Sequence, residues 1–159
     1  MIKPELHRLS LTNPLHWIAT GFGSGLSPKA PGTVGSVAAI PLFYLLQLLP
    51  MPAYLAFLVF AFVIGVWACQ VAGNAIGVED HGALVWDEFV GMWIACIALP
   101  QGLWWMVAAF IAFRFFDILK PGPIGWLDKH CSGGFGVMMD DVAAGLAALG
   151  VVQLAYWVI

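Results

Sequence analysis

Charged residues divide this chain into three polar segments separated by long uncharged stretches. The fifteen charged side chains, six basic and nine acidic, all fall within residues 3–29, 79–88 and 114–141. Residues 30–78 hold no charge and are interrupted by Pro50-Met51-Pro52. A membrane-spanning helix needs about 20 apolar residues. This stretch therefore predicts two membrane helices that turn at the prolines.

The uncharged stretch 89–113 fits either one tilted span or a hairpin of two shorter helices. Pro100-Gln101-Gly102 favours the hairpin, because proline followed closely by glycine is typical of a turn. Its arms would cover about 84–99 and 103–118. Val142–Ile159 would form one more crossing. The pattern predicts five membrane helices, with every lysine and arginine on the cytosolic face, as the positive-inside rule favours.

The composition agrees with a membrane protein. Hydrophobic residues make up 62% of the 159 positions, charged residues 9%, and the mean hydropathy is +0.92. We expect one all-α domain over residues 1–159, without a cleavable signal peptide. The net charge of −3 excludes a nucleic-acid binder. Three cysteines, without a CxxC pair, do not indicate a disulfide framework.

Two carboxylate pairs stand at the edges of apolar stretches. Asp87-Glu88 precedes one such stretch and Asp140-Asp141 precedes the last. A carboxylate in a bilayer costs roughly 2.5–3.5 kcal/mol on insertion scales, so such acids are functional candidates. Stabilisation of a helix N-terminus explains one acid of a pair well. The repeated pair favours a bound cation, and oxygen ligands with few histidines favour Mg²⁺ over zinc.

Further polar residues lie near these pairs. Asp80 precedes the first pair within a short polar loop. Arg114, Asp117 and Lys120 are spaced so that neighbours share roughly one helix face. They form either a surface ion-pair ladder or a functional set, in which Asp117 binds metal and Lys120 binds phosphate.

Two glycine-bearing loops are candidate phosphate sites. Residues 27–36 lead into the first span, where Thr33 is a natural N-cap and the following amides can receive an anion. Lys29 adds a positive charge, although an ordinary capped turn facing lipid is the alternative. Residues 128–136 form the second loop, in which the closely spaced glycines at 133, 134 and 136 would allow a backbone to approach a phosphate.

Taken together, five segments resemble the phosphatidylglycerophosphatase A family, in the family's order, from about Asn13 to Gly145. They are GFGSGLSP from Gly21, PGTVGS from Pro31, HGALVWDE from His81 with a following GMW, RFFDILKP from Arg114, and GGFGVMMDDVAAG from Gly133. The resemblance implies a Mg²⁺-dependent phosphatase of the bacterial inner membrane that converts phosphatidylglycerophosphate to phosphatidylglycerol. It also implies an all-helical fold around a central helix.

Both lines of argument suggest one mechanism. Mg²⁺ at the cytosolic interface would orient a water for attack on the phosphomonoester. Asp128 or His130 would protonate the leaving glycerol oxygen, and an aspartyl-phosphate intermediate stays open. The predicted metal ligands are Asp87, Glu88, Asp117 and one of Asp140 or Asp141, helped by Asp80. The predicted phosphate-binding groups are Lys29, Lys120 and the segment Thr33–Ser36, with Gly35 inside it.

Other functions fit parts of the pattern. A CDP-alcohol phosphotransferase is also membrane-bound and Mg²⁺-dependent, but its DGxxAR motif is missing, and it would release CMP instead of phosphate. A divalent-cation transporter would place acids near mid-membrane on several helices. A lipid-binding scaffold would tolerate Asp87→Asn. The expected partners are the phospholipid substrate and the bilayer; the oligomeric state is not predicted.

Overall fold

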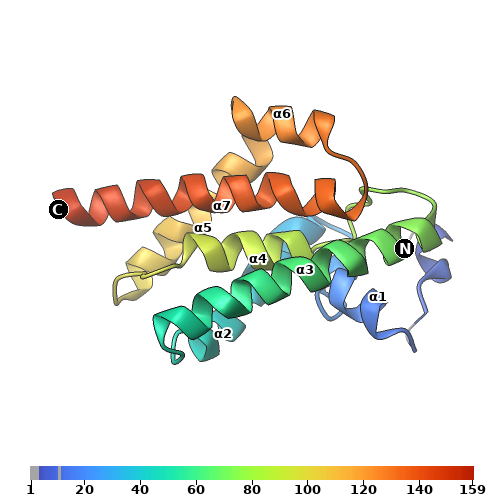
Figure 1. Ribbon diagram of the computed structural model, residues 1–159, viewed down its shortest axis with the longest axis horizontal. Helices are drawn as coiled ribbons and strands as arrows, with labels where there is room; N and C mark the ends of the chain where they lie inside the picture. The colour runs from blue at the N-terminus through green and yellow to red at the C-terminus, as the bar shows by residue number, and fades with distance from the viewer. Residues whose placement is uncertain (1–3, 11) are drawn as a thin grey trace.

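The described residues of the computed structural model, 4–10 and 12–159, form helices and connecting loops without a β-strand (Figure 1). Lys3, one of the six basic residues, is not among the described residues. The all-α prediction is confirmed. The helices are two 3-10 helices, Pro4–Arg8 and Ser24–Leu26, and seven α-helices: α1 (Pro14–Ala19), α2 (Pro31–Leu46), α3 (Met51–Ile76), α4 (Trp86–Ala95), α5 (Leu103–Leu119), α6 (Pro123–His130) and α7 (Gly133–Val158).

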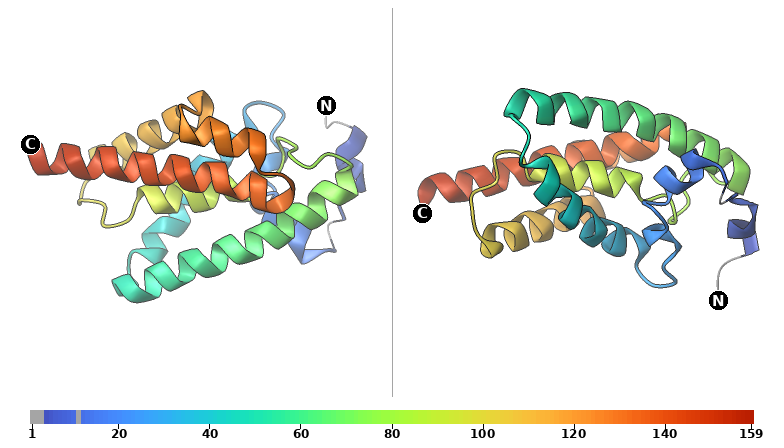
Figure 2. Two further views of the ribbon diagram at one scale, coloured as in Figure 1. Left: turned by 45° about the horizontal axis from the view of Figure 1, so that its top comes forward. Right: turned by 90° about the horizontal axis from the view of Figure 1, so that it is seen from below.

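Helix α4 is the central element of the bundle. Nine of its ten residues are buried, and it packs against α2, α3, α5 and α7 (Figure 2). Indole groups fix it laterally: Trp86 Nε1 donates to Ala61 O of α3 at 2.9 Å, and Trp93 Nε1 donates to Ala39 O of α2 at 3.0 Å. A helix that is apolar nearly all round and covered on all sides is stabilised by packing despite its short length.

Helices α3 and α7 are the long elements, with 26 residues each. At 1.5 Å per residue each extends about 39 Å, enough to cross the ~30 Å hydrocarbon core of a bilayer. The start of α7 lies against the later part of α3, where Gly134 N donates to Gln70 Oε1 at 2.9 Å. From there the two helices run apart with α4 between them (Figures 1 and 2).

The prediction of about five membrane helices is wrong by length and composition. Among the described helices only α3 and α7 are long and apolar enough to cross a membrane. Helix α2 has 16 residues, α5 has 17 and α4 only 10. After α4 ends at Ala95, Ala98 and Gly102 take positive φ values of 51° and 123° in the turn that leads to α5. The hairpin break near Pro100 is therefore present, but its first arm is short.

The exposed surface of the long helices is apolar. Only 33% of the most apolar window of α3 is buried, although its mean hydropathy there is 2.3. Val59, Phe60 and Val63 of α3 are each more than half exposed, as are Leu154 and Trp157 of α7. Soluble proteins rarely expose contiguous apolar patches of this kind. The two candidate spans and their apolar faces indicate a membrane-associated protein.

Candidate functional site

Three carboxylates from two helices meet inside the bundle. Asp87 and Glu88 lie in the first turn of α4, and Asp141 lies in α7. One oxygen from each lies within 4.8 Å of the other two. Asp87 is only 8% exposed and Asp141 only 2%. We call these three residues the acid cluster.

The close approach of α4 and α7 depends on two glycines. A Cβ on Gly145 would lie 2.5 Å from the backbone oxygen of Gly91, and a Cβ on Gly91 would lie 2.8 Å from the backbone oxygen of Asp141. Real Cβ atoms do not approach backbone oxygens so closely. The absence of both side chains allows Asp141 to reach the acids of α4.

The start of α7 differs from the prediction. We expected Asp140 and Asp141 at the N-terminus of a helix beginning near Val142, after a flexible glycine loop. The helix begins instead at Gly133, so Gly133, Gly134 and Gly136 belong to its first turn. The physical reason is close contact with α3: a Cβ on Gly134 would lie 2.0 Å from Val66 O. These glycines serve helix packing, and the acids lie two turns inside α7.

Arg114 of α5 connects the acid cluster to its surroundings. Its Nη1 forms an ion pair with Asp117 and lies 3.9 Å from Glu88 Oε1. The same nitrogen donates to Ser36 Oγ of α2 at 3.3 Å. The i, i+3 spacing in the sequence indicated the pair with Asp117. The contacts to Glu88 and Ser36 were missed, because they depend on how three helices pack.

Helix α2 brings its first turn to the same place. A Cβ on Gly32 would lie 2.2 Å from Glu88 Oε1. The predicted N-cap at Thr33 is wrong: α2 begins at Pro31 and its N-cap is Ala30, in the left-handed region with φ 45°. Proline fits the first helical position because it has no N–H to satisfy there. Gly35 and Ser36 are buried and face the acid region, Gly35 against Val85 and Ser36 against Arg114.

Lys120 connects α6 to α7. It ends α5 with φ 43°, and its Nζ donates to Asp128 Oδ1 and to Asp140 Oδ2, each at 2.5 Å. Burial lowers the pKa of Lys120, but the bonds and charges of the two aspartates outweigh burial and raise it. Lys120 therefore stays charged. Beside it is a cavity of about 210 Å³ lined in part by Glu79, Asp80, Asp128 and Asp140.

Burial makes the acids of α4 hard to ionise without a cation. Burial first, and then the charge of Glu88, raises the pKa of Asp87 well above its usual range. Burial also raises the pKa of Glu88 to about 7, although the nearby Arg114 opposes the shift. Arg114 forms ion pairs with Glu88 and Asp117, and the salt bridges of the described residues include none to Asp87 or Asp141. With all four acids ionised, this region would carry a net negative charge.

The acid cluster fits a hard divalent cation. Three of its oxygens, Asp87 Oδ1, Glu88 Oε2 and Asp141 Oδ2, are buried and have no hydrogen-bond partner in the described part of the chain. Unpaired buried carboxylate oxygens are costly unless they coordinate a metal. Mg²⁺ takes oxygen ligands and needs only one or two carboxylates besides water and phosphate. The donor set contains carboxylate oxygens, which Mg²⁺ prefers, and none of the cysteine or histidine ligands typical of structural zinc sites.

The structure does not bring every predicted residue to the acid cluster. Asp80 is exposed and lines the neighbouring cavity instead. Lys29 is exposed before α2. His130 is exposed at the end of α6, where its ring stacks on Trp126 at 4.6 Å and its Nδ1 lies 2.8 Å from Trp126 O.

Comparison with known proteins places this arrangement in a family. The model of the phosphatidylglycerophosphatase A family matches residues 17–156. The chain belongs to the phosphatidylglycerophosphatase A family. The matched segment includes the acid cluster, Arg114 and Lys120. No solved structure matches the chain significantly.

Three relatives match most of the chain. Phosphatidylglycerophosphatase A of Escherichia coli K12 is 49% identical over 145 residues, 91% of this chain and 84% of the relative. The Haemophilus influenzae protein of the same name is 48% identical over 157 residues, 97% of this chain and 96% of the relative. A Bacteroides thetaiotaomicron protein is 43% identical over 150 residues, 89% of this chain and 93% of the relative, and its name, given provisionally, is phosphatidylinositol-3-phosphatase.

Proposed function

We propose that this chain hydrolyses phosphatidylglycerophosphate to phosphatidylglycerol and inorganic phosphate, with Mg²⁺ held by Asp87, Glu88 and Asp141. Membership of the phosphatidylglycerophosphatase A family supports the reaction. The observation that supports the metal is the meeting of three acids, each with one carboxylate oxygen within 4.8 Å of the other two residues' oxygens. Each acid also has a buried oxygen without a hydrogen-bond partner among the described residues. Family membership therefore favours a phosphatase, which releases inorganic phosphate, over a phosphotransferase or a cation transporter.

The chain's own residues have distinct roles in this proposal. A bound divalent cation would polarise the phosphate and neutralise the charge that develops as the ester bond breaks. Arg114 holds Asp117 and orients Glu88, while its buried Nε has no partner among the described residues and is available to a phosphate oxygen. Lys120 uses two of its three N–H groups on Asp128 and Asp140, which leaves one for phosphate.

Proton delivery is assigned to Asp128. The leaving glycerol oxygen needs a proton. Asp128 lies beside the cavity with a side chain 34% exposed, so it can take up a proton from solvent, leave its ion pair with Lys120, and pass that proton to the oxygen. The placement of His130 against Trp126 gives no support to the same role. The prediction that the amides of Thr33–Ser36 bind phosphate narrows to those of Gly32 and Thr33, because α2 begins at Pro31 and Val34 N already donates to Ala30 O. These two amides and Lys29 remain proposals for phosphate binding.

Membrane placement follows from the same elements. We place the protein in the bacterial inner membrane with several passes and with the acids near the cytosolic face. Arg8 bonds Ile76 O at the end of α3, and Lys120 bonds Asp140 near the start of α7. Positive charge gathered at this end of both long helices agrees with the positive-inside rule.

The test is phosphate release by purified protein from phosphatidylglycerophosphate in mixed micelles. We expect activity with Mg²⁺, loss of activity in EDTA with recovery when Mg²⁺ is restored, and a fall of roughly 10²-fold or more for Asp141→Asn. Asp80→Asn, an exposed acid outside the cluster, is the matched control and should retain activity. Activity that persists in EDTA would remove the metal. Release only from phosphatidylinositol 3-phosphate would replace the substrate.

A further inference from the structure

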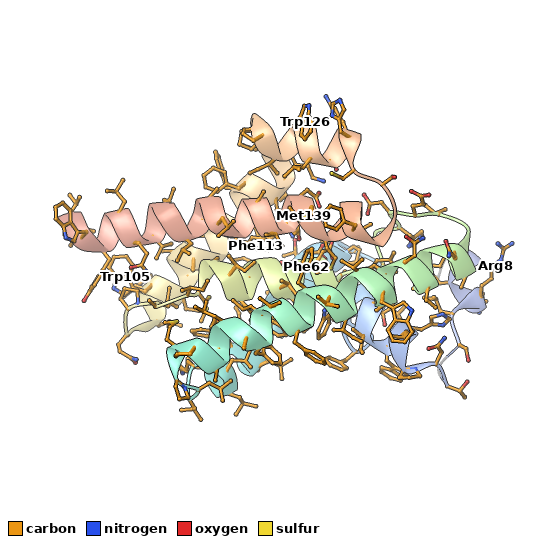
Figure 3. The ribbon with its side chains drawn as sticks, in the orientation of Figure 1. Arg8, Phe62, Trp105, Phe113, Trp126 and Met139 are labelled. Atoms are coloured by element: carbon orange, nitrogen blue, oxygen red, sulfur yellow. The ribbon has the colours of Figure 1, made fainter. Side chains whose placement is uncertain are left out.

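An apolar groove separates the two long helices on one side of α4. It has a volume of about 350 Å³, and none of its lining side chains is polar. Phe62 and Met139, labelled in Figure 3, belong to this lining and come from α3 and α7. The full lining is Leu55, Leu58, Val59, Phe62, Val90, Ile94, Ile97, Met139, Val142 and Leu146.

The groove begins beside the acid cluster. On α4, Asp87, Val90 and Ile94 follow one another at helical spacing, so the acid heads the same face that lines the groove, and Ile97 continues the lining just after the helix. On α7, Met139 and Val142 lie within one turn of the Asp140-Asp141 pair, although neighbouring side chains of a helix point in different directions. One end of the groove is therefore at the level of the acids along α7, and Asp87 of α4 is the acid nearest to its lining face.

The groove then runs along the long helices, away from their charged ends. On α7 it extends from Met139 to Leu146, and on α3 from Phe62 back to Leu55. Seven residues of helix rise about 10 Å. Because α3 and α7 run in opposite directions, both series of residues lead the same way, away from the level of the acids: toward the middle of α7 and toward the N-terminal part of α3. In a bilayer this direction is from the interface into the hydrocarbon core.

We propose that this groove holds the first part of one acyl chain of the phospholipid substrate while its phosphate meets the acid cluster. The inference rests on the proposed function. A phospholipid joins a charged head to apolar chains within one molecule, and the groove supplies apolar surface directly beside the charged site. Bulk lipid is the competing occupant and is an outcome of the test.

The groove acts by orientation more than by affinity. A lipid chain gains little hydrophobic free energy on moving from bilayer to groove, because the bilayer is equally apolar. Contact with the walls instead fixes the direction in which the head group leaves the chain. Misplacement of a reacting group by about 1 Å can cost up to 10²-fold in rate. Blocking the groove should therefore lower kcat/KM for the acylated substrate alone.

Leu146→Trp fills the groove without disturbing a buried position, because Leu146 is 54% exposed. Side chains on a helix lean toward its N-terminus, so the indole would lie over the groove. Leu154→Trp is the matched control: it is in the same helix, 63% exposed, and outside the groove. Val59→Trp, 65% exposed, tests the opposite wall.

The experiment compares dioleoyl phosphatidylglycerophosphate with its deacylated, water-soluble head group in mixed micelles at fixed Mg²⁺. We expect both groove variants to lower kcat/KM for the dioleoyl substrate by roughly tenfold. Activity on the deacylated substrate and the activity of Leu154→Trp should match wild type. Unchanged dioleoyl activity in both groove variants would show that bulk lipid alone fills the groove and would overturn the proposal.

Two further results would also overturn it. An equal loss on both substrates would show damage to the acid cluster instead of the groove. Failure of wild-type protein to release phosphate from either substrate would remove the proposed function and the groove's role with it. The two failures can be told apart: if wild type is active and the groove variants are unaffected, the groove proposal is wrong and the proposed function stands.

Discussion

Glu88 is the residue at which proton and metal binding compete. Its pKa is raised to about 7 chiefly by burial, against an ordinary value near 4.3. As pH rises above the ordinary value, the unfolded chain ionises first while the folded, metal-free protein keeps its proton. The stability of the metal-free protein therefore falls as pH rises toward about 7 and levels off above that pH. The total fall is about 1.4 kcal/mol for each unit by which the folded pKa exceeds the unfolded one.

Thermal unfolding of EDTA-treated protein between pH 5 and pH 8 checks this. The midpoint should fall with pH in EDTA and should fall less with Mg²⁺, since a cation favours the ionised carboxylate. Glu88→Gln should make the EDTA profile shallower, and the remaining fall comes from Asp87, whose pKa burial also raises. An EDTA profile that rises between pH 5 and pH 7 would contradict the direction of the pKa shift.

Arg114 stabilises acids that would otherwise lie together uncompensated. Removing one partner of a buried ion pair costs about 3–5 kcal/mol, because the other charge stays buried. We expect Arg114→Gln to lose stability on this scale, and the double variant Arg114→Gln/Asp117→Asn to recover part of it. Unfolding of the two single variants and the double variant in detergent forms the cycle. Purely additive losses would show that the ion pair does not couple the two residues.

At the scale of helices, the α4–α7 contact sets the distance between the acids. Gly145→Ala adds a Cβ 2.5 Å from Gly91 O, so the helices must move apart. The expected loss of stability is about 1–3 kcal/mol, with weaker Mg²⁺ binding because Asp141 moves from α4. Gly150→Ala in the same helix meets nothing within 4 Å. It should gain up to about 1 kcal/mol from helix propensity.

Unfolding temperature and Mg²⁺ titration of the two alanine variants provide the measurement. Equal stability in Gly145→Ala and Gly150→Ala would show that the contact between α4 and α7 is looser than the structure has it.

Some of this architecture was predictable from local sequence. Pro50 and Pro52 indicated the break between α2 and α3, and Pro100 with Gly102 indicated the break before α5. The start of α7 was not predictable, because Gly133 and Gly134 have the composition of a loop and become helical through contact with α3. The partners of Arg114 likewise depend on three helices that only tertiary packing brings together.

At the scale of the whole molecule, we expect α7 to cross the membrane, because it is long and apolar enough to do so. Cys131 lies just before α7 and is partly exposed, whereas Cys69 and Cys96 are buried. A cysteine placed by Ile159→Cys would lie at the other end, where Ile159 is 97% exposed. An impermeant thiol reagent should label Cys131 in inverted inner-membrane vesicles. In a Cys131→Ser background it should label Ile159→Cys in spheroplasts only.

Labelling of both positions from the same side would contradict a crossing by α7. The predicted number of membrane helices was wrong, because the uncharged stretches suggested five spans of similar length, whereas only α3 and α7 among the described helices are long enough. Only packing shows that α4 is a short internal helix.

The most direct test of the central claim is to measure Mg²⁺ binding to chelator-stripped protein by calorimetric titration in detergent. Wild type and Asp80→Asn should bind Mg²⁺ alike, and Asp141→Asn, with the cluster reduced to two carboxylates, should bind at least roughly tenfold more weakly. Equal binding by all three proteins, or no binding by an active wild type, would contradict the assignment of Asp87, Glu88 and Asp141 as the metal site.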